Sequence, residues 1–77
     1  MDYGYTEVKV GGSRVSLVLV DITEFNTETL NLFRERYGDT TAICYLDEKG
    51  VLFTEGLSQA LPQAIDLPDF ESRRLEN

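Results

Sequence analysis

The sequence contains no histidine, one cysteine and only two prolines. Without histidine, the chain lacks the commonest general base and the commonest neutral metal ligand. Nucleophilic sites of the Ser-His-Asp and Cys-His kinds are therefore excluded. We expect a protein that is not an enzyme and that binds no metal and no cofactor.

Long apolar runs are also missing. The longest strongly apolar run covers residues 17–20, far short of the roughly 20 residues that cross a bilayer. The first residues carry neither the basic nor the apolar region of a signal peptide. Because Cys44 is alone, it favours a reducing, intracellular setting and is expected to be a small buried side chain. We therefore expect a cytoplasmic protein.

Charge is the most unusual bulk property. Fourteen acidic residues against seven basic ones give a net charge of −7. The chain has 77 residues, a length that is enough for one domain. Nucleic-acid binding depends on Lys and Arg to neutralise phosphates, so direct binding is not expected. The same charge repels an anionic membrane surface and attracts a basic protein surface.

Alternating residues on both sides of Gly11-Gly12 predict a β-hairpin over residues 6–20, because glycine tolerates the positive φ of a tight turn. Residues 11–14, which include this glycine pair, lack the spacing of a phosphate-binding loop. One face of this hairpin is expected to carry Thr6, Val8, Val10, Val15, Leu17 and Leu19. The other face is polar near the turn and becomes apolar further away, at Tyr3, Tyr5, Val18 and Val20.

Residues 21–38 predict a helix with two competing starts. Either Asp21 caps it and forms a capping box, or Asn26 caps it five residues later. Gly38 is a natural stop. The apolar stripe of this helix, at helical spacing, consists of Leu30, Phe33 and Tyr37.

Residues 40–55 predict a second hairpin, closed by a type I turn with Gly50 in a left-handed conformation. If Leu46 lies opposite Val51, both faces are apolar. One face then carries Ala42, Cys44, Leu46, Val51 and Phe53, and the other carries Ile43, Tyr45, Leu52 and Thr54.

These elements predict an α+β fold of the order β-β-α-β-β, with a four-stranded mixed sheet and one helix on one face. The helix joins the second and third strands, which are parallel if they share a sheet. The simple order 1-2-3-4 and the β-grasp order 2-1-4-3 both fit. Residues 1–56 form the core, and residues 57–77 form a coil or short-helix segment that is partly docked and frayed at its end.

One helix covers one face of such a sheet, so the second apolar face is expected to be an interaction surface. The leading hypothesis is a small protein-binding module that occludes a basic surface of a partner protein. Inhibitors, antitoxin- or immunity-like proteins and phage-type blockers have this profile, with mimicry of nucleic acid as one form. The alternative is a homo-oligomer, such as a homodimer, or an assembly subunit that pairs through the second face or an edge strand.

Two sets of candidate binding residues follow from this hypothesis. Tyrosine buries a large ring while its hydroxyl stays in water, and carboxylates speed association with a basic surface. The expected apolar patch consists of Tyr3, Tyr5, Tyr45 and Leu52. The expected acidic set consists of Glu24, Glu28, Asp47 and Glu48, which also have simpler roles near a helix start and in a turn.

Overall fold

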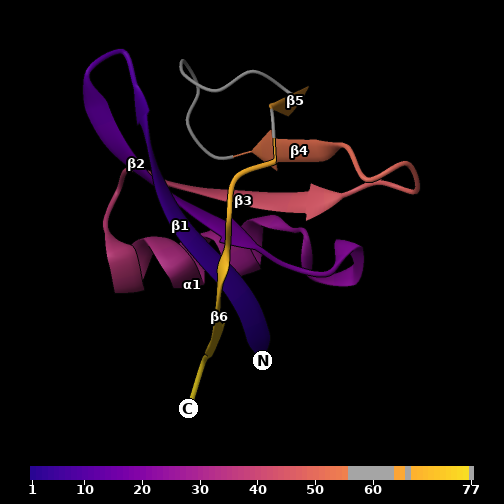
Figure 1. Cartoon of the computed structure of the whole chain (residues 1–77). Helices are drawn as coiled ribbons and strands as arrows, with labels where there is room; N and C mark the ends of the chain where they lie inside the picture. Colours follow the sequence, from indigo (N-terminus) through magenta and orange to yellow (C-terminus); the bar gives the residue numbers. More distant parts are fainter. Residues whose placement is uncertain (56–63, 66, 77) are drawn as a thin grey trace.

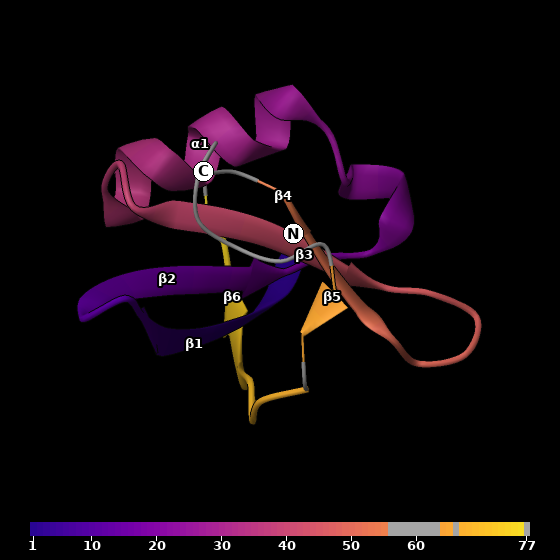
Figure 2. The same ribbon diagram turned by 90° about the horizontal axis from the view of Figure 1, so that it is seen from above.

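The computed structural model describes residues 1–55, 64–65 and 67–76. Over these residues one helix lies across one face of a six-stranded mixed sheet (Figures 1 and 2), which confirms the α+β class. The elements are β1 (Asp2–Val10), β2 (Ser13–Leu19), the 3₁₀ turn η1 (Ile22–Glu24), α1 (Thr27–Tyr37), β3 (Thr41–Leu46), β4 (Leu52–Glu55), β5 (Ala64–Ile65) and β6 (Glu71–Arg74). Within the described residues, none of the helices has the length and apolar character needed to span a membrane.

The strand order is β5-β4-β3-β2-β1-β6. The four expected strands therefore follow the simple order, and β2 and β3 are parallel as their helical connection predicts. The C-terminal segment was expected to be coil or a short helix; residues 67–70 are coil, but the segment also contains two strands, because β5 pairs with β4 and β6 pairs with β1. The unpaired backbone groups of an edge strand can pair with a further strand, and the composition of the C-terminal segment does not reveal this pairing. The expected boundary between residues 56 and 57 lies outside the described residues.

The first hairpin has the predicted turn and the predicted faces. Gly11 and Gly12 have φ angles of 57° and 86°, and a two-residue turn of type I′ needs a positive φ at both positions. In the resulting register, Val8 lies opposite Val15, and Tyr5 lies opposite Val18.

The segment 21–38 uses both predicted caps, so it forms two elements and not one helix. The Asp21 carboxylate accepts hydrogen bonds from the backbone N–H of Thr23 (3.1 Å) and from its hydroxyl (2.6 Å), at the start of η1. The Asn26 side chain accepts from the N–H of Thr29 (2.8 Å) and caps α1. Gly38 ends α1 with a φ of 107°.

The second hairpin has the predicted glycine turn but a different register. Asp47 Oδ1 accepts from the backbone N–H of Lys49 and of Val51, both at 2.8 Å, and Gly50 has a φ of 80°. Asp47 N–H also donates to the Val51 carbonyl. This adds one residue to the loop, so Leu46 lies opposite Leu52 and not Val51.

The helix lies over the face that was expected to stay open. Leu30 and Phe33 of α1 pack on Tyr3, Val18 and Ile43, and the rings of Tyr3 and Phe33 meet edge to face at 4.7 Å. Alternation showed that two apolar faces exist, but nothing in it determines which face receives the helix. The stripe predicted for the helix is the one that faces the core.

The opposite face is buried as well. Its core cluster consists of Val15, Leu17, Ala42, Cys44 and Leu52. Phe70 packs on this cluster and belongs to the segment before β6, which runs on the side of the sheet away from α1 (Figure 2). Gly4 makes room for it, because a Cβ at this position would lie only 3.0 Å from the Cβ of Phe70. Part of the C-terminal segment therefore covers this face.

The position of α1 can be tested by truncating neighbouring helix residues. Phe33→Ala removes a fully buried ring and is expected to lower the free energy of unfolding by about 3–5 kcal/mol. Leu32→Ala, at a side chain that is 40% exposed, is expected to change it by less than about 1 kcal/mol. Urea unfolding followed by circular dichroism measures both values. Equal losses for the two variants would contradict this helix orientation.

Candidate functional site

The structure does not bring the four residues of the expected apolar patch to one exposed surface. Tyr3 and Leu52 are 4% and 1% exposed, and they belong to core clusters on opposite faces of the sheet. Tyr5 and Tyr45 are half-buried. The reasons are the helix, which covers Tyr3, and the one-residue change of register, which moves Leu52 to the other face.

Tyr3 and Tyr5 instead belong to a tyrosine–arginine cluster, formed with Tyr37 and Arg73. The hydroxyls of Tyr3 and Tyr37 are hydrogen-bonded to each other, and Arg73 Nη1 donates to the Tyr37 hydroxyl at 3.2 Å. The rings of Tyr5 and Tyr37 stack at 4.4 Å, and the Arg73 guanidinium lies 4.1 Å from the centre of the Tyr5 ring. Through Arg73, the cluster therefore connects β6 to Tyr5 of β1 and to Tyr37 of α1.

The pKa values of Tyr3 and Tyr37 are shifted in opposite directions. Burial raises the pKa of Tyr3, and its hydrogen bond with Tyr37 raises it further. Burial also raises the pKa of Tyr37, but its hydrogen bonds with Tyr3 and Arg73 lower it by more, so that the pKa of Tyr37 lies below its usual range. Tyr37 accepts a hydrogen bond from Arg73, and its phenolate is the form that these neighbours favour.

The segments that carry the expected acidic residues leave the sheet at the same end. The carboxyl ends of parallel strands meet at the same edge of a sheet, and the N–H of Val20 donates to the Cys44 carbonyl there. The rings of Phe25 and Tyr45 meet at 4.6 Å at this edge, and α1 starts beside it (Figure 1). We call this region the acidic end; it consists of Asp21, Glu24, Glu28, Asp47 and Glu48.

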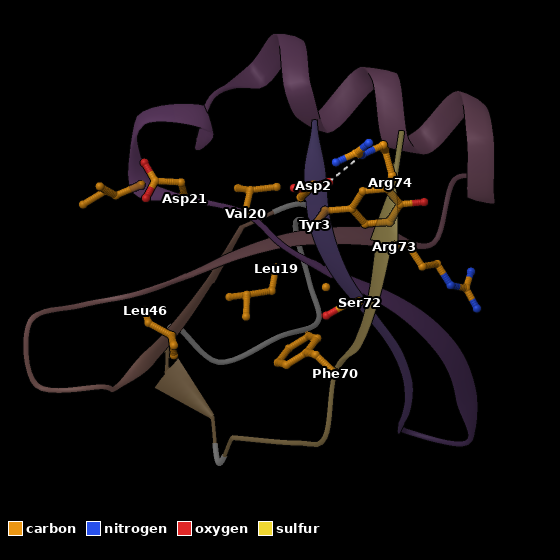
Figure 3. Close-up of a pocket in the computed structure, with 12 residues that line it drawn as sticks. Asp2, Tyr3, Leu19, Val20, Asp21, Leu46, Phe70, Ser72, Arg73 and Arg74 are labelled. Atoms are coloured by element: carbon orange, nitrogen blue, oxygen red, sulfur yellow. Dashed lines mark hydrogen bonds and ion pairs between the residues drawn. The ribbon is translucent and has the colours of Figure 1, made fainter. Parts of the chain in front are cut away.

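A groove with a cavity volume of about 830 Å³ adjoins the acidic end (Figure 3). It lies between the start of β1, the ends of β2 and β3, and the region of β6. Its apolar lining includes Leu19, Ile22, Leu46 and Phe70, and its charged lining includes Asp2, Asp21, Arg73 and Arg74. Sequence reasoning missed this groove because it forms only when the C-terminal strand returns beside β1.

The two arginines of the groove are paired with acids. Arg74 Nε lies 2.9 Å from the Asp2 carboxylate, and its hydrogen bond and charge lower the pKa of Asp2. Arg73 Nη2 lies 3.0 Å from the Glu71 carboxylate. The hydrogen bonds from Thr23 lower the pKa of Asp21, so this carboxylate at the rim of the groove stays ionised in neutral solution.

Cys44 is a small core side chain, as predicted. It is buried in the cluster opposite α1, and this burial raises the pKa of its thiol to about 12. The reactive thiolate is therefore absent at neutral pH. Within the part of the chain that the structure describes, no three side chains of His, Cys, Asp or Glu are grouped so that they could hold a metal ion.

Comparisons with known protein families, curated proteins and solved structures gave no match. The candidate site therefore rests on the acidic end and the groove beside it.

The burial of Cys44 predicts that its thiol reacts slowly in the native protein. We expect the native protein to react with a disulfide reagent at pH 8 more than about 100-fold more slowly than the urea-unfolded chain, because the thiolate fraction is far smaller. Absorbance of the released thiolate measures both rates. Similar rates in the two states would show that Cys44 is accessible in the native fold.

The hydrogen bonds of the tyrosine–arginine cluster predict an order of ionisation. Tyr37 is expected to lose its proton at a lower pH than Tyr3 or Tyr5, whose pKa values are raised by burial. Tyr3→Phe removes the hydrogen bond between the two hydroxyls, which lowers the pKa of Tyr37, and is therefore expected to raise that pKa. The ¹³C chemical shifts of the tyrosine rings report each titration. An unchanged Tyr37 pKa in this variant would show that the hydrogen bond with Tyr3 does not lower it.

Proposed function

We propose that the protein is a small, acidic, non-enzymatic module that binds a partner protein and covers a basic surface on it. The supporting observation is the acidic end. Its residues lie in two segments, 21–28 and 47–48, and most of α1 and all of β3 lie between these segments in the sequence. The parallel pairing of β2 and β3 brings both segments to one edge.

Some of the basic residues are engaged outside the acidic end, whereas Lys49 directly follows Glu48 in the loop after β3. Three of the seven form ion pairs outside the acidic end: Arg14 with Glu7, Arg73 with Glu71, and Arg74 with Asp2. The excess negative charge at the acidic end is therefore not neutralised by these pairs. A field of this kind raises the rate of association with a basic surface and weakens as salt is added.

The alternative of a homo-oligomer has less support. The face expected to pair with a second copy carries α1. The edge strand β6 has only four residues, of which Glu71, Arg73 and Arg74 are charged, and short charged edges disfavour pairing with another sheet. The mass of the protein in solution, measured by light scattering, separates a monomer from an oligomer.

The proposed function predicts partners that are basic and bound in a salt-dependent way. In capture experiments from the native host lysate, followed by mass spectrometry, we expect partners with basic surfaces that are retained at low salt and lost at high salt. A triple variant, Glu24→Gln, Glu28→Gln and Glu48→Gln, is expected to weaken binding of the purified partner by about tenfold. Asp47 is kept because its carboxylate shapes the loop.

A matched control changes the net charge by the same amount at other places. The triple variant Glu35→Gln, Asp39→Asn and Glu76→Gln removes three exposed acids outside the acidic end. This variant is expected to retain most of the affinity. Equal losses for the two triple variants, or binding that high salt leaves unchanged, would contradict the proposal.

A further inference from the structure

The groove presents apolar surface at the end of the sheet, beside the acidic end. Leu19 and Leu46 are the last residues of β2 and β3, and Phe70 lies across from them (Figure 3). Leu46 is 38% exposed, and Ile22 at the rim is 60% exposed. Exposed apolar side chains gathered in a concave site favour a bound apolar group.

The position of Phe70 is determined by the β1–β6 pairing. Gly4 lies opposite Leu19 on one side and opposite Ser72 on the other. Because Gly4 has no side chain, Phe70 approaches the strand closely and forms one wall of the groove. The groove is thus built on paired strands, and binding does not have to order this wall first.

The charges around the groove determine the kind of group that fits it. Arg74 is paired with Asp2, and Arg73 with Glu71 and Tyr37, so the groove's cations are neutralised locally. On the other side, Asp21 is at the rim, and Asp47 directly follows Leu46. The open side of the groove that adjoins the acidic end is therefore negative, which complements a basic ligand.

We propose that this groove binds one large apolar side chain, such as leucine, that is flanked by lysine or arginine on a segment of the partner. This inference rests on the proposed function and names the feature by which the partner is recognised. The apolar side chain is the buried anchor of the complex, and its basic neighbours lie against the acidic end. Such central anchors carry most of the affinity of an interface, whereas charges at the rim mainly steer association.

Three short peptides test the proposal against the full-length chain. The first is Lys-Lys-Leu-Lys-Lys, the second has alanine in place of leucine, and the third has glutamate in place of every lysine. Amide NMR spectra of the labelled protein are recorded during titration with each peptide. We expect the leucine peptide to shift the amides of Leu19, Leu46 and Ser72, the alanine peptide to bind about tenfold more weakly, and the glutamate peptide not to bind.

Two exposed side chains of the second hairpin supply a matched pair of variants. Leu46 lines the groove, and Val51 lies outside it, with exposed fractions of 38% and 39%. Leu46→Ser is expected to weaken the leucine peptide by about tenfold and to leave the alanine peptide unchanged, whereas Val51→Ser is expected to change neither. If Leu46→Ser disturbs the fold in the NMR spectrum, Ile22→Ser tests the rim at a more exposed position.

The outcomes separate this inference from the proposed function. If the leucine and alanine peptides bind equally, with shifts confined to the acidic end, the groove inference is overturned and the acidic binding surface is retained. If the glutamate peptide binds as well as the leucine peptide, the preference for a basic ligand is overturned together with the proposed function. Loss of the leucine preference in Leu46→Ser, but not in Val51→Ser, supports the inference.

Discussion

The parallel pairing of β2 with β3 is the constraint on which the rest of the structure depends. Parallel strands need a long connection between them, and here η1 and α1 supply it, on one face of the sheet (Figure 2). The same pairing places the carboxyl ends of both strands at one edge. The acidic end and the groove lie at this edge because the segment that follows β2 packs on the end of β3, from which the next loop begins.

The C-terminal strand completes both faces of the sheet around this pair. From the segment that includes β6, Phe70 packs on the cluster opposite α1, and Leu75 packs on the cluster beneath it. Arg73 joins the same segment to Tyr5 and Tyr37. A chain of 77 residues buries a modest share of its surface, so these contacts add apolar burial that β1–β4 and α1 do not provide by themselves.

Among the described residues, packed side chains lie on both faces of the sheet, and the groove lies at its end. This changes the nature of the candidate site from a flat patch of tyrosines to a concave groove beside carboxylates. Tyr3, expected at a binding surface, is instead part of the core, and its hydroxyl is satisfied by Tyr37. Leu46, whose position at the end of β3 leaves it partly exposed, is the apolar contact that we propose in its place.

Local chemistry determined what the sequence alone could predict: the turn at Gly11-Gly12, the caps Asp21 and Asn26, the end of α1 at Gly38, and the parallel β2–β3 pair. Each depends on backbone conformation or hydrogen bonds within a few residues, or on the geometry of a helical connection. The tertiary structure decided the face that carries α1, the pairing of Asp2 with Arg74, and therefore the groove. These features depend on contacts between segments far apart in the chain, and an alternating pattern is equally consistent with a helix on either face.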